Sequence, residues 1–158
     1  MAIRHYDAKN FNGDGSIGHL LKVSHSLLHV LQGQSFAGHD LSFIQWLILL
    51  KLRENAQLTA SELCRRMNHD NGALTRLLDQ LEERGYITRH RSAEDRRVVE
   101  LGLTAAGRRK AEEMLPLAVN NLNAALAGFS KSEFAELIRL LNKFIDNLKV
   151  ATSQEAAP

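Results

Sequence analysis

The clearest structural signals of the chain lie in residues 59–107, TASELCRRMNHDNGALTRLLDQLEERGYITRHRSAEDRRVVELGLTAAG. Its first part holds two helical patterns with a very short connection between them. Thr59 is followed three residues later by Glu62, which is the spacing of a helix capping box. Asp70 is a good N-cap for a second helix, and Gly85 supplies its C-terminal stop. Two helices joined by a turn of about three residues predict a helix-turn-helix.

After Gly85 the hydrophobic pattern changes from helical spacing to alternation. Residues 86–91 and 98–103 therefore predict two short strands, joined by the charged segment 92–97. The apolar residues of the second strand are expected on one face: Val99, Leu101 and Leu103. A polar hairpin directly behind a helix-turn-helix predicts a wing.

Outside this segment the pattern is helical. Further helices are expected at residues 16–31, 42–54 and 104–127, with a last one starting at 130 or 132. The helix at 42–54 is apolar on nearly all sides, which is typical of a helix in the middle of a core. Pro116 is expected to kink the long helix. The predicted fold class is mainly α with a small β wing.

Length and composition narrow the class of protein. A chain of 158 residues is near the usual size of one domain, and no stretch approaches the roughly 20 apolar residues that span a membrane. A single cysteine, Cys64, and an N-terminus without signal-peptide layout favour a soluble cytoplasmic protein with no membrane association. The sequence offers no nucleophile with its base and no spaced carboxylate pair, so an enzyme is not expected.

The charge of the chain is distributed unevenly. Residues 65–110 carry eleven Lys or Arg against seven Asp or Glu, whereas the rest carries nine against eleven. Eight of the eleven cations are arginines between positions 65 and 97. A local basic surplus of this kind favours a nucleic acid as partner.

Two runs of residues resemble the MarR family, the multiple-antibiotic-resistance regulators. The run 95–107, DRRVVELGLTAAG, is similar to the wing signature DxRxxxLxLTxxG of that family. Upstream, residues 74–85, LTRLLDQLEERG, resemble its recognition helix with the LExxG ending. The similarity extends over about residues 16–150, with one departure: Asn68 stands where the family often has Gly, and Asn also tolerates a left-handed turn.

The resemblance implies a homodimeric winged helix-turn-helix regulator. Such proteins are usually repressors, released from a pseudo-palindromic operator by a small molecule such as a phenolic or aromatic carboxylate. The expected organisation is a flexible N-terminus at 1–15, a helical dimerisation region at 16–40 and 104–150, a DNA-binding lobe at 41–103, and a flexible tail at 151–158.

The second helix of the helix-turn-helix carries the candidates for reading DNA. With its leucines facing the core, the opposite side of the first two turns presents Asn71, Gly72, Thr75 and Arg76. Arg76 suits guanine, and Asn71 suits adenine or a phosphate. Thr75 suits a phosphate or a thymine methyl group, and Gly72 allows close approach of the backbone.

The resemblance assigns Arg97 of the wing to the minor groove, with Asp95 holding its guanidinium through a charge-assisted bond. Arg96 is expected near the tip, touching phosphate. Four further arginines are candidates for contacts to the DNA backbone: Arg65, Arg66, Arg89 and Arg91. Each of these four could instead pair with Glu82, Glu83 or Glu94.

The resemblance also places the dimer interface on the terminal helices. The last helix has an apolar stripe that fits this role: Phe134, Leu137, Ile138, Leu141, Ile145 and Leu148. The alternative is that the stripe belongs to an intramolecular core.

The resemblance also implies a pocket for a small-molecule effector. The resemblance makes His25, His29, Phe43 and Trp46 candidates for the pocket, although the two aromatic residues could be pure core and the histidines could face solvent or a dimer contact. We expect no cofactor and no metal site. Three alternatives stay open: metal sensing through His25 and His29, redox sensing through Cys64, and a winged helix used only for protein contacts.

Overall fold

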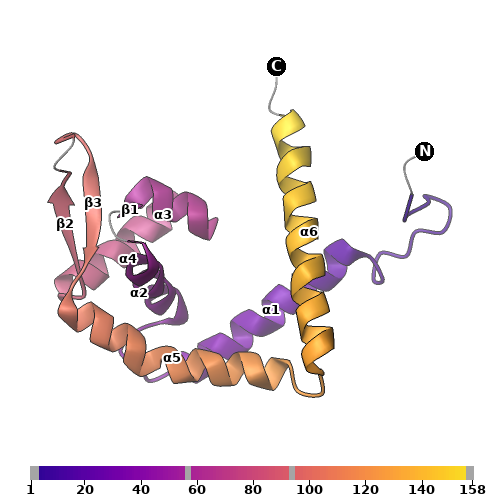
Figure 1. The fold of residues 1–158 in the computed structure, drawn as a ribbon, viewed down its shortest axis with the longest axis horizontal. Coiled ribbons are helices and arrows are strands. Elements are labelled where there is room, and N and C mark those ends of the chain that lie inside the picture. The colour runs from indigo at the N-terminus through magenta and orange to yellow at the C-terminus, as the bar shows by residue number, and fades with distance from the viewer. Residues whose placement is uncertain (1–3, 56–57, 93–94, 156–158) are drawn as a thin grey trace. The chain divides into compact units, whose positions relative to one another are not determined.

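The computed structural model describes residues 4–55, 58–92 and 95–155. The elements, in chain order, are α1 (Ile17–Phe36), α2 (Phe43–Glu54), β1 (Leu58–Thr59), α3 (Ala60–Met67), α4 (Asn71–Glu83), β2 (Ile87–Arg91), β3 (Val99–Leu103), α5 (Ala105–Ala125) and α6 (Lys131–Glu155) (Figure 1). The chain forms two compact units, Met1–Asn121 and Leu122–Pro158. The predicted fold class, mainly α with a small β wing, is confirmed.

Parts of three expected segments lie outside the described residues. These are Ala93 and Glu94 of the wing loop, residues 1–3 of the N-terminal segment and residues 156–158 of the tail.

The helix-turn-helix forms through the local signals that the sequence contains. The Thr59 hydroxyl accepts from the Glu62 backbone N–H at 3.2 Å, and the Glu62 carboxylate accepts from the Thr59 N–H at 2.9 Å, which completes the capping box of α3. Asn68 has φ +48° in the turn. Asp70 caps α4 by accepting from the Ala73 N–H at 2.9 Å. The predicted caps and turn are confirmed.

The sheet has three antiparallel strands in the order β1-β3-β2. β2 pairs with β3 from Ile87 opposite Leu103 to Arg91 opposite Val99, and this hairpin is the expected wing. β1 was not predicted. It is only two residues long, and Thr59 combines its strand pairing with the capping of α3.

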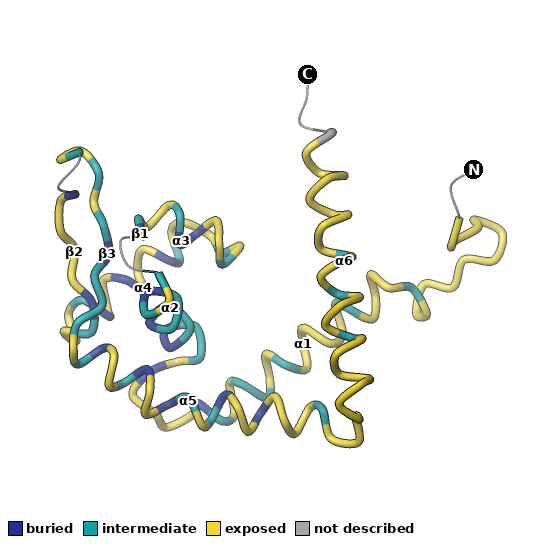
Figure 2. Tube along the Cα trace, viewed as in Figure 1, coloured by how far each residue is buried: buried dark blue, intermediate teal, exposed yellow. Residues whose placement is uncertain are grey.

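The core of the first unit surrounds α2. Ile48 and Leu49 of this helix are completely buried, and they belong to one hydrophobic cluster with Leu78 of α4, Ile87 of β2 and Leu101 of β3. Figure 2 shows the buried residues gathered over α2, α4 and the start of the wing. The prediction that α2 lies inside the core is confirmed, and this core holds α4 with its polar side outward.

The LTxxG end of the wing signature has a structural explanation. The Thr104 hydroxyl lies 2.8 Å from the carbonyl of Gly85 and accepts from the Gly107 N–H at 3.0 Å, so it caps α5 and joins it to the end of α4. A Cβ at position 107 would lie 2.1 Å from the Tyr86 carbonyl oxygen. Only glycine allows α5 to pass this close to the base of the wing.

Several boundaries differ from the expected ones. α1 continues to Phe36, five residues beyond 31, and α6 continues to Glu155, so the segment from 151 to 155 is helical. α5 contains Pro116 and is helical from Ala105 to Ala125; a kink at the proline stays a prediction. Val99 is 46% exposed, unlike the fully buried Leu101, because it lies at the far end of the hairpin from the core.

Candidate DNA-binding surface

The first two turns of α4 form an exposed polar surface. Asn71, Gly72, Thr75 and Arg76 are all exposed, while Leu74 on the opposite side is buried. The Thr75 hydroxyl donates to the Asn71 carbonyl at 2.8 Å. Within the described part of the chain, the Arg76 side chain has no hydrogen bond and no ion pair. The structure thus brings the four predicted residues together with a cation free to bind a ligand.

The N-terminus of α4 is tightly built. A Cβ at position 72 would lie 3.3 Å from the Asp70 carboxylate oxygen that caps the helix. Gly72 therefore leaves room for the cap in addition to keeping the first turn open to solvent.

In the wing, Asp95 and Arg97 form the expected ion pair. Nε and Nη2 of Arg97 each donate to a different carboxylate oxygen of Asp95 at 3.1 Å. These bonds lower the pKa of Asp95 below its ordinary value, with a further contribution from the Arg97 backbone N–H. The side chain of Arg97 is still 91% exposed, so the pairing orients it without covering it.

Four other arginines, two on α3 and two in the wing, divide into two groups. Arg66 donates to the Asn55 side-chain oxygen at 2.7 Å, and Arg91 donates to the Arg96 carbonyl at 2.9 Å. Arg65 and Arg96 are exposed, and their side chains have no hydrogen bond or ion pair with the residues that the structure describes. Arg65 and Arg96 are therefore better placed than Arg66 or Arg91 to meet phosphates.

Arg89 is paired with two acidic residues of α4. Its Nη1 lies 2.8 Å from the Glu82 carboxylate, and its Nη2 lies 2.7 Å from that of Asp79. Glu82 was one of the expected alternative partners; Asp79 was not. Both partners are distant from Arg89 in sequence, and no local pattern signals the pairing.

The candidate effector residues fall into two places. Phe43 and Trp46 pack with Phe36 in an aromatic cluster, with ring centroids 5.4 to 5.7 Å apart. Trp46 is 4% exposed, and its indole N–H donates to the Ala111 carbonyl at 2.9 Å. His25 and His29 lie exposed on α1. Among the described residues, no hydrogen bond or ion pair joins these histidines to the aromatic cluster.

A cluster around Asp40, in the connector between α1 and α2, is not predicted by the sequence. Its carboxylate accepts from the Tyr86 hydroxyl and lies 3.8 Å from Arg84 and 3.9 Å from Lys110. The Arg84 guanidinium also donates to the Asp40 carbonyl. The bond from Tyr86, followed by the two cations, lowers the pKa of Asp40, and the same bond raises the pKa of Tyr86. The cluster joins the connector to the end of α4, the base of the wing and α5.

Among the described residues, the structure supports neither metal sensing nor redox sensing. The described residues contain no group of three or more His, Cys, Asp or Glu side chains close enough to hold a metal ion. Cys64 is buried, and its thiol donates to the His69 carbonyl.

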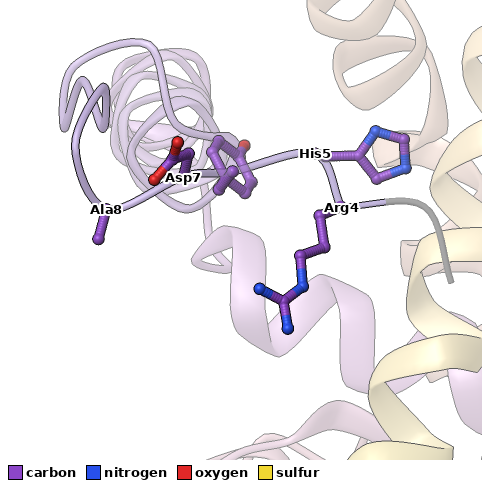
Figure 3. Close-up of a pocket in the computed structure, with 5 residues that line it drawn as sticks. Arg4, His5, Asp7 and Ala8 are labelled. Carbon is purple, nitrogen blue, oxygen red and sulfur yellow. The ribbon is translucent and has the colours of Figure 1, made fainter.

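A shallow hollow in the segment before α1 is lined by residues 4–8, and the Arg4 and His5 side chains diverge there (Figure 3).

Most residues of the predicted dimer stripe on α6 are exposed. Phe134, Ile138, Ile145 and Leu148 of α6 are each more than two-fifths exposed, and Leu137 and Leu141 are partly covered. α1 exposes a second apolar set: Ile17, Leu20, Val23, Leu27 and Val30.

A helix-turn-helix with an exposed, cation-bearing second helix, followed by an arginine-rich hairpin, defines the class of winged helix-turn-helix proteins. Comparison with known proteins supports this class. A family model described as "MarR family" matches residues 39–98. The chain is similar to winged-helix transcriptional regulators of the MarR family over this segment.

The chain is also similar to individual transcriptional regulators. The chain is 29% identical over 133 residues to the HTH-type transcriptional repressor YetL of Bacillus subtilis, covering 83% of this chain and 79% of the relative. It is 34% identical over 102 residues to the transcriptional repressor MprA of Escherichia coli, covering 65% and 58%. The crystal structure of apo MarR from E. coli aligns with a TM-score of 0.71 and 28% identity, over 82% of this chain and 96% of that one. These relatives are transcriptional regulators and not enzymes.

Among the described residues, no helix has the length and apolar character needed to cross a bilayer.

Proposed function

We propose that this chain is a homodimeric transcriptional repressor that binds a pseudo-palindromic operator and is released from it by a small-molecule effector. The observation that carries the proposal is the pair of exposed guanidinium groups on two adjacent elements. Arg76 on α4 has no partner among the described residues, and Arg97 in the wing is oriented by Asp95. This combination suits a helix in the major groove and a wing in the minor groove.

Each of the four exposed residues in the first two turns of α4 then has a defined role. Arg76 reads a guanine edge, and Asn71 reads an adenine or holds a phosphate. The Thr75 hydroxyl already donates to the Asn71 carbonyl, which favours a contact between its methyl group and a thymine methyl over a bond to phosphate. Gly72 lets the backbone of the first turn approach the DNA.

The remaining arginines supply affinity without reading sequence. Arg65 and Arg96 contact phosphates, because their guanidinium groups have no partner among the described residues. Arg66 and Arg91 would have to exchange an internal hydrogen bond for a phosphate.

Dimerisation covers the apolar faces of the terminal helices. A single chain leaves Phe134, Ile138, Ile145 and Leu148 exposed on α6 alone, and apolar faces of this extent mark interaction sites. Two chains present two recognition helices, which bind half-sites about one helical turn apart.

The effector is an aromatic carboxylate of the phenolic-acid type, bound beside the cluster of Phe36, Phe43 and Trp46. An unpaired amide of α5 supports a ligand that carries a carboxylate. Asn121 of α5 is buried and accepts from the Ser35 hydroxyl at 2.7 Å, but its Nδ2 has no hydrogen-bond partner among the described residues. A buried amide donor without a partner is costly, and a carboxylate would satisfy it.

The experiment is a gel shift with the promoter next to this protein's own gene, at fixed salt. A retarded complex of one dimer per site is expected, and salicylate should release it. An Asn121→Ala variant should still bind DNA but respond more weakly to salicylate. No shift with any neighbouring promoter would contradict an operator next to this protein's own gene. Release by zinc or peroxide in place of salicylate would favour the metal- or redox-responsive alternatives.

A further inference from the structure

We propose that Arg89 is a positioning residue, which offsets part of the negative charge of two carboxylates of the recognition helix and fixes the wing against that helix, and is not a ligand of DNA phosphate. This inference rests on the proposed function, because it concerns how α4 and the wing meet DNA. It departs from the expectation that Arg89 contacts the DNA backbone.

The geometry of Arg89 differs from that of the free arginines. Both of its terminal nitrogens are occupied, at 2.7 Å from Asp79 and 2.8 Å from Glu82. Its side chain is 30% exposed, against 91% for Arg97. Because the two acids stand on α4 and the arginine on β2, the pairing connects two elements that must approach DNA together.

The acids explain why such a residue is needed. Asp79 lies one helical turn after Arg76 on α4, and Glu82 lies one turn further. Without a counter-charge, their carboxylates would repel the phosphates beside the groove that Arg76 enters. Arg89 supplies one positive charge to the two acids, and its two ion pairs hold β2 in a fixed position against α4.

A phosphate contact by Arg89 would undo this arrangement. It would break two charge-assisted hydrogen bonds and leave Asp79 and Glu82 unpaired next to the DNA backbone. Arg65 and Arg96 face no such loss, since they have no partner among the described residues.

The test measures operator affinity against salt concentration for four proteins. These are the wild type, Arg89→Ala, the double variant Asp79→Asn/Glu82→Gln, and the triple variant that combines them. Arg96→Ala is the matched control for a lost phosphate contact. Counterion release predicts that a lost phosphate contact makes the salt slope shallower by about one.

We expect Arg89→Ala to weaken binding about tenfold with an unchanged slope, whereas Arg96→Ala reduces the slope by about one. The triple variant should bind within about threefold of the double variant, because Arg89 has no carboxylates left to neutralise. A slope reduced by about one in Arg89→Ala, or the same loss with and without the acids, would overturn the inference.

A second measurement separates this inference from the proposed function. Urea unfolding of the same variants, without DNA, should show that the Arg89 and acid substitutions are not additive. If the wild type fails to bind DNA, the proposed function fails, yet non-additive unfolding would still support the positioning role. Additive unfolding would count against it.

Discussion

The carboxylate of Asp95 holds the guanidinium of Arg97 through two hydrogen bonds of 3.1 Å, and it also accepts from the Arg97 backbone N–H at 3.0 Å. The two residues are separated by only one position in the wing. The pairing therefore fixes an arginine that is otherwise surrounded by solvent, and an ordered side chain loses less conformational entropy when it binds.

Asp95→Asn should weaken operator binding while leaving the salt slope unchanged. The amide cannot hold the guanidinium as the carboxylate does, but the charge of Arg97 remains. We expect a loss of about 0.5–1.5 kcal/mol, from the cost of ordering one long side chain on binding. Fluorescence anisotropy over a range of salt concentrations measures both quantities. Tighter binding by the variant would show that the negative charge of Asp95 opposes DNA more than its pairing helps.

Gly107→Ala should destabilise the fold. The new methyl group would lie 2.1 Å from the Tyr86 carbonyl oxygen and 2.8 Å from Leu103 Cδ1, so the base of the wing must move. A cost of about 1–3 kcal/mol is expected for such overpacking. Urea unfolding at one protomer concentration measures it.

The control is Gly33→Ala in α1, where a Cβ meets nothing within 4 Å. Removing a glycine from a helix interior should stabilise by about 0.5–1 kcal/mol. Equal effects at the two glycines would show that the close approach at position 107 is unimportant.

Most of the DNA-binding lobe could be predicted from sequence because its signals are local. The Thr59 and Glu62 capping box, Asn68 in the turn and Asp70 at the N-cap each act within a few residues. The pairing of Asp95 with Arg97 is local as well.

What could not be predicted depends on residues that only the fold brings together. Asp40 meets Tyr86 across 46 positions, and Arg89 meets Asp79 across ten. β1 has two residues, too few to show alternation, and owes its existence to pairing with β3. Which arginines stay free for DNA is therefore a property of the fold, and a count of cations does not give it.

Asp40→Asn should remove a pH-dependent part of the stability. The pKa of Asp40 in the folded chain lies below its ordinary value of 3.8, chiefly because the Tyr86 hydroxyl donates to it. A lowered pKa contributes stability above the unfolded value, and this contribution is lost as the pH falls through the folded value.

The difference in unfolding free energy between wild type and Asp40→Asn should therefore be largest above about pH 5 and shrink below about pH 4. Urea unfolding from pH 3 to 7 checks this, with Asp146→Asn in an exposed ion pair of α6 as control. A difference that stays constant over this range would mean that the charge of Asp40 does not stabilise the cluster.

Ile138→Asp should disrupt the dimer. Ile138 is exposed on the apolar face of α6, and burying a carboxylate at an interface without a partner is costly. Sedimentation velocity should show a shift from dimer to monomer at micromolar concentration. Asn147→Asp adds the same charge to the same helix at a polar position and should leave the dimer intact. A variant at position 138 that remains a dimer would exclude this face from the interface.

The assignment of this surface to DNA is tested by the operator affinity of Arg76→Ala and Arg97→Ala at fixed salt, compared with the wild type. If α4 enters the major groove and the wing the minor groove, each variant should lose about 1–3 kcal/mol of specific binding. Arg97→Ala should also have a shallower salt slope. Unchanged affinity in both variants would contradict the assignment of this surface to DNA.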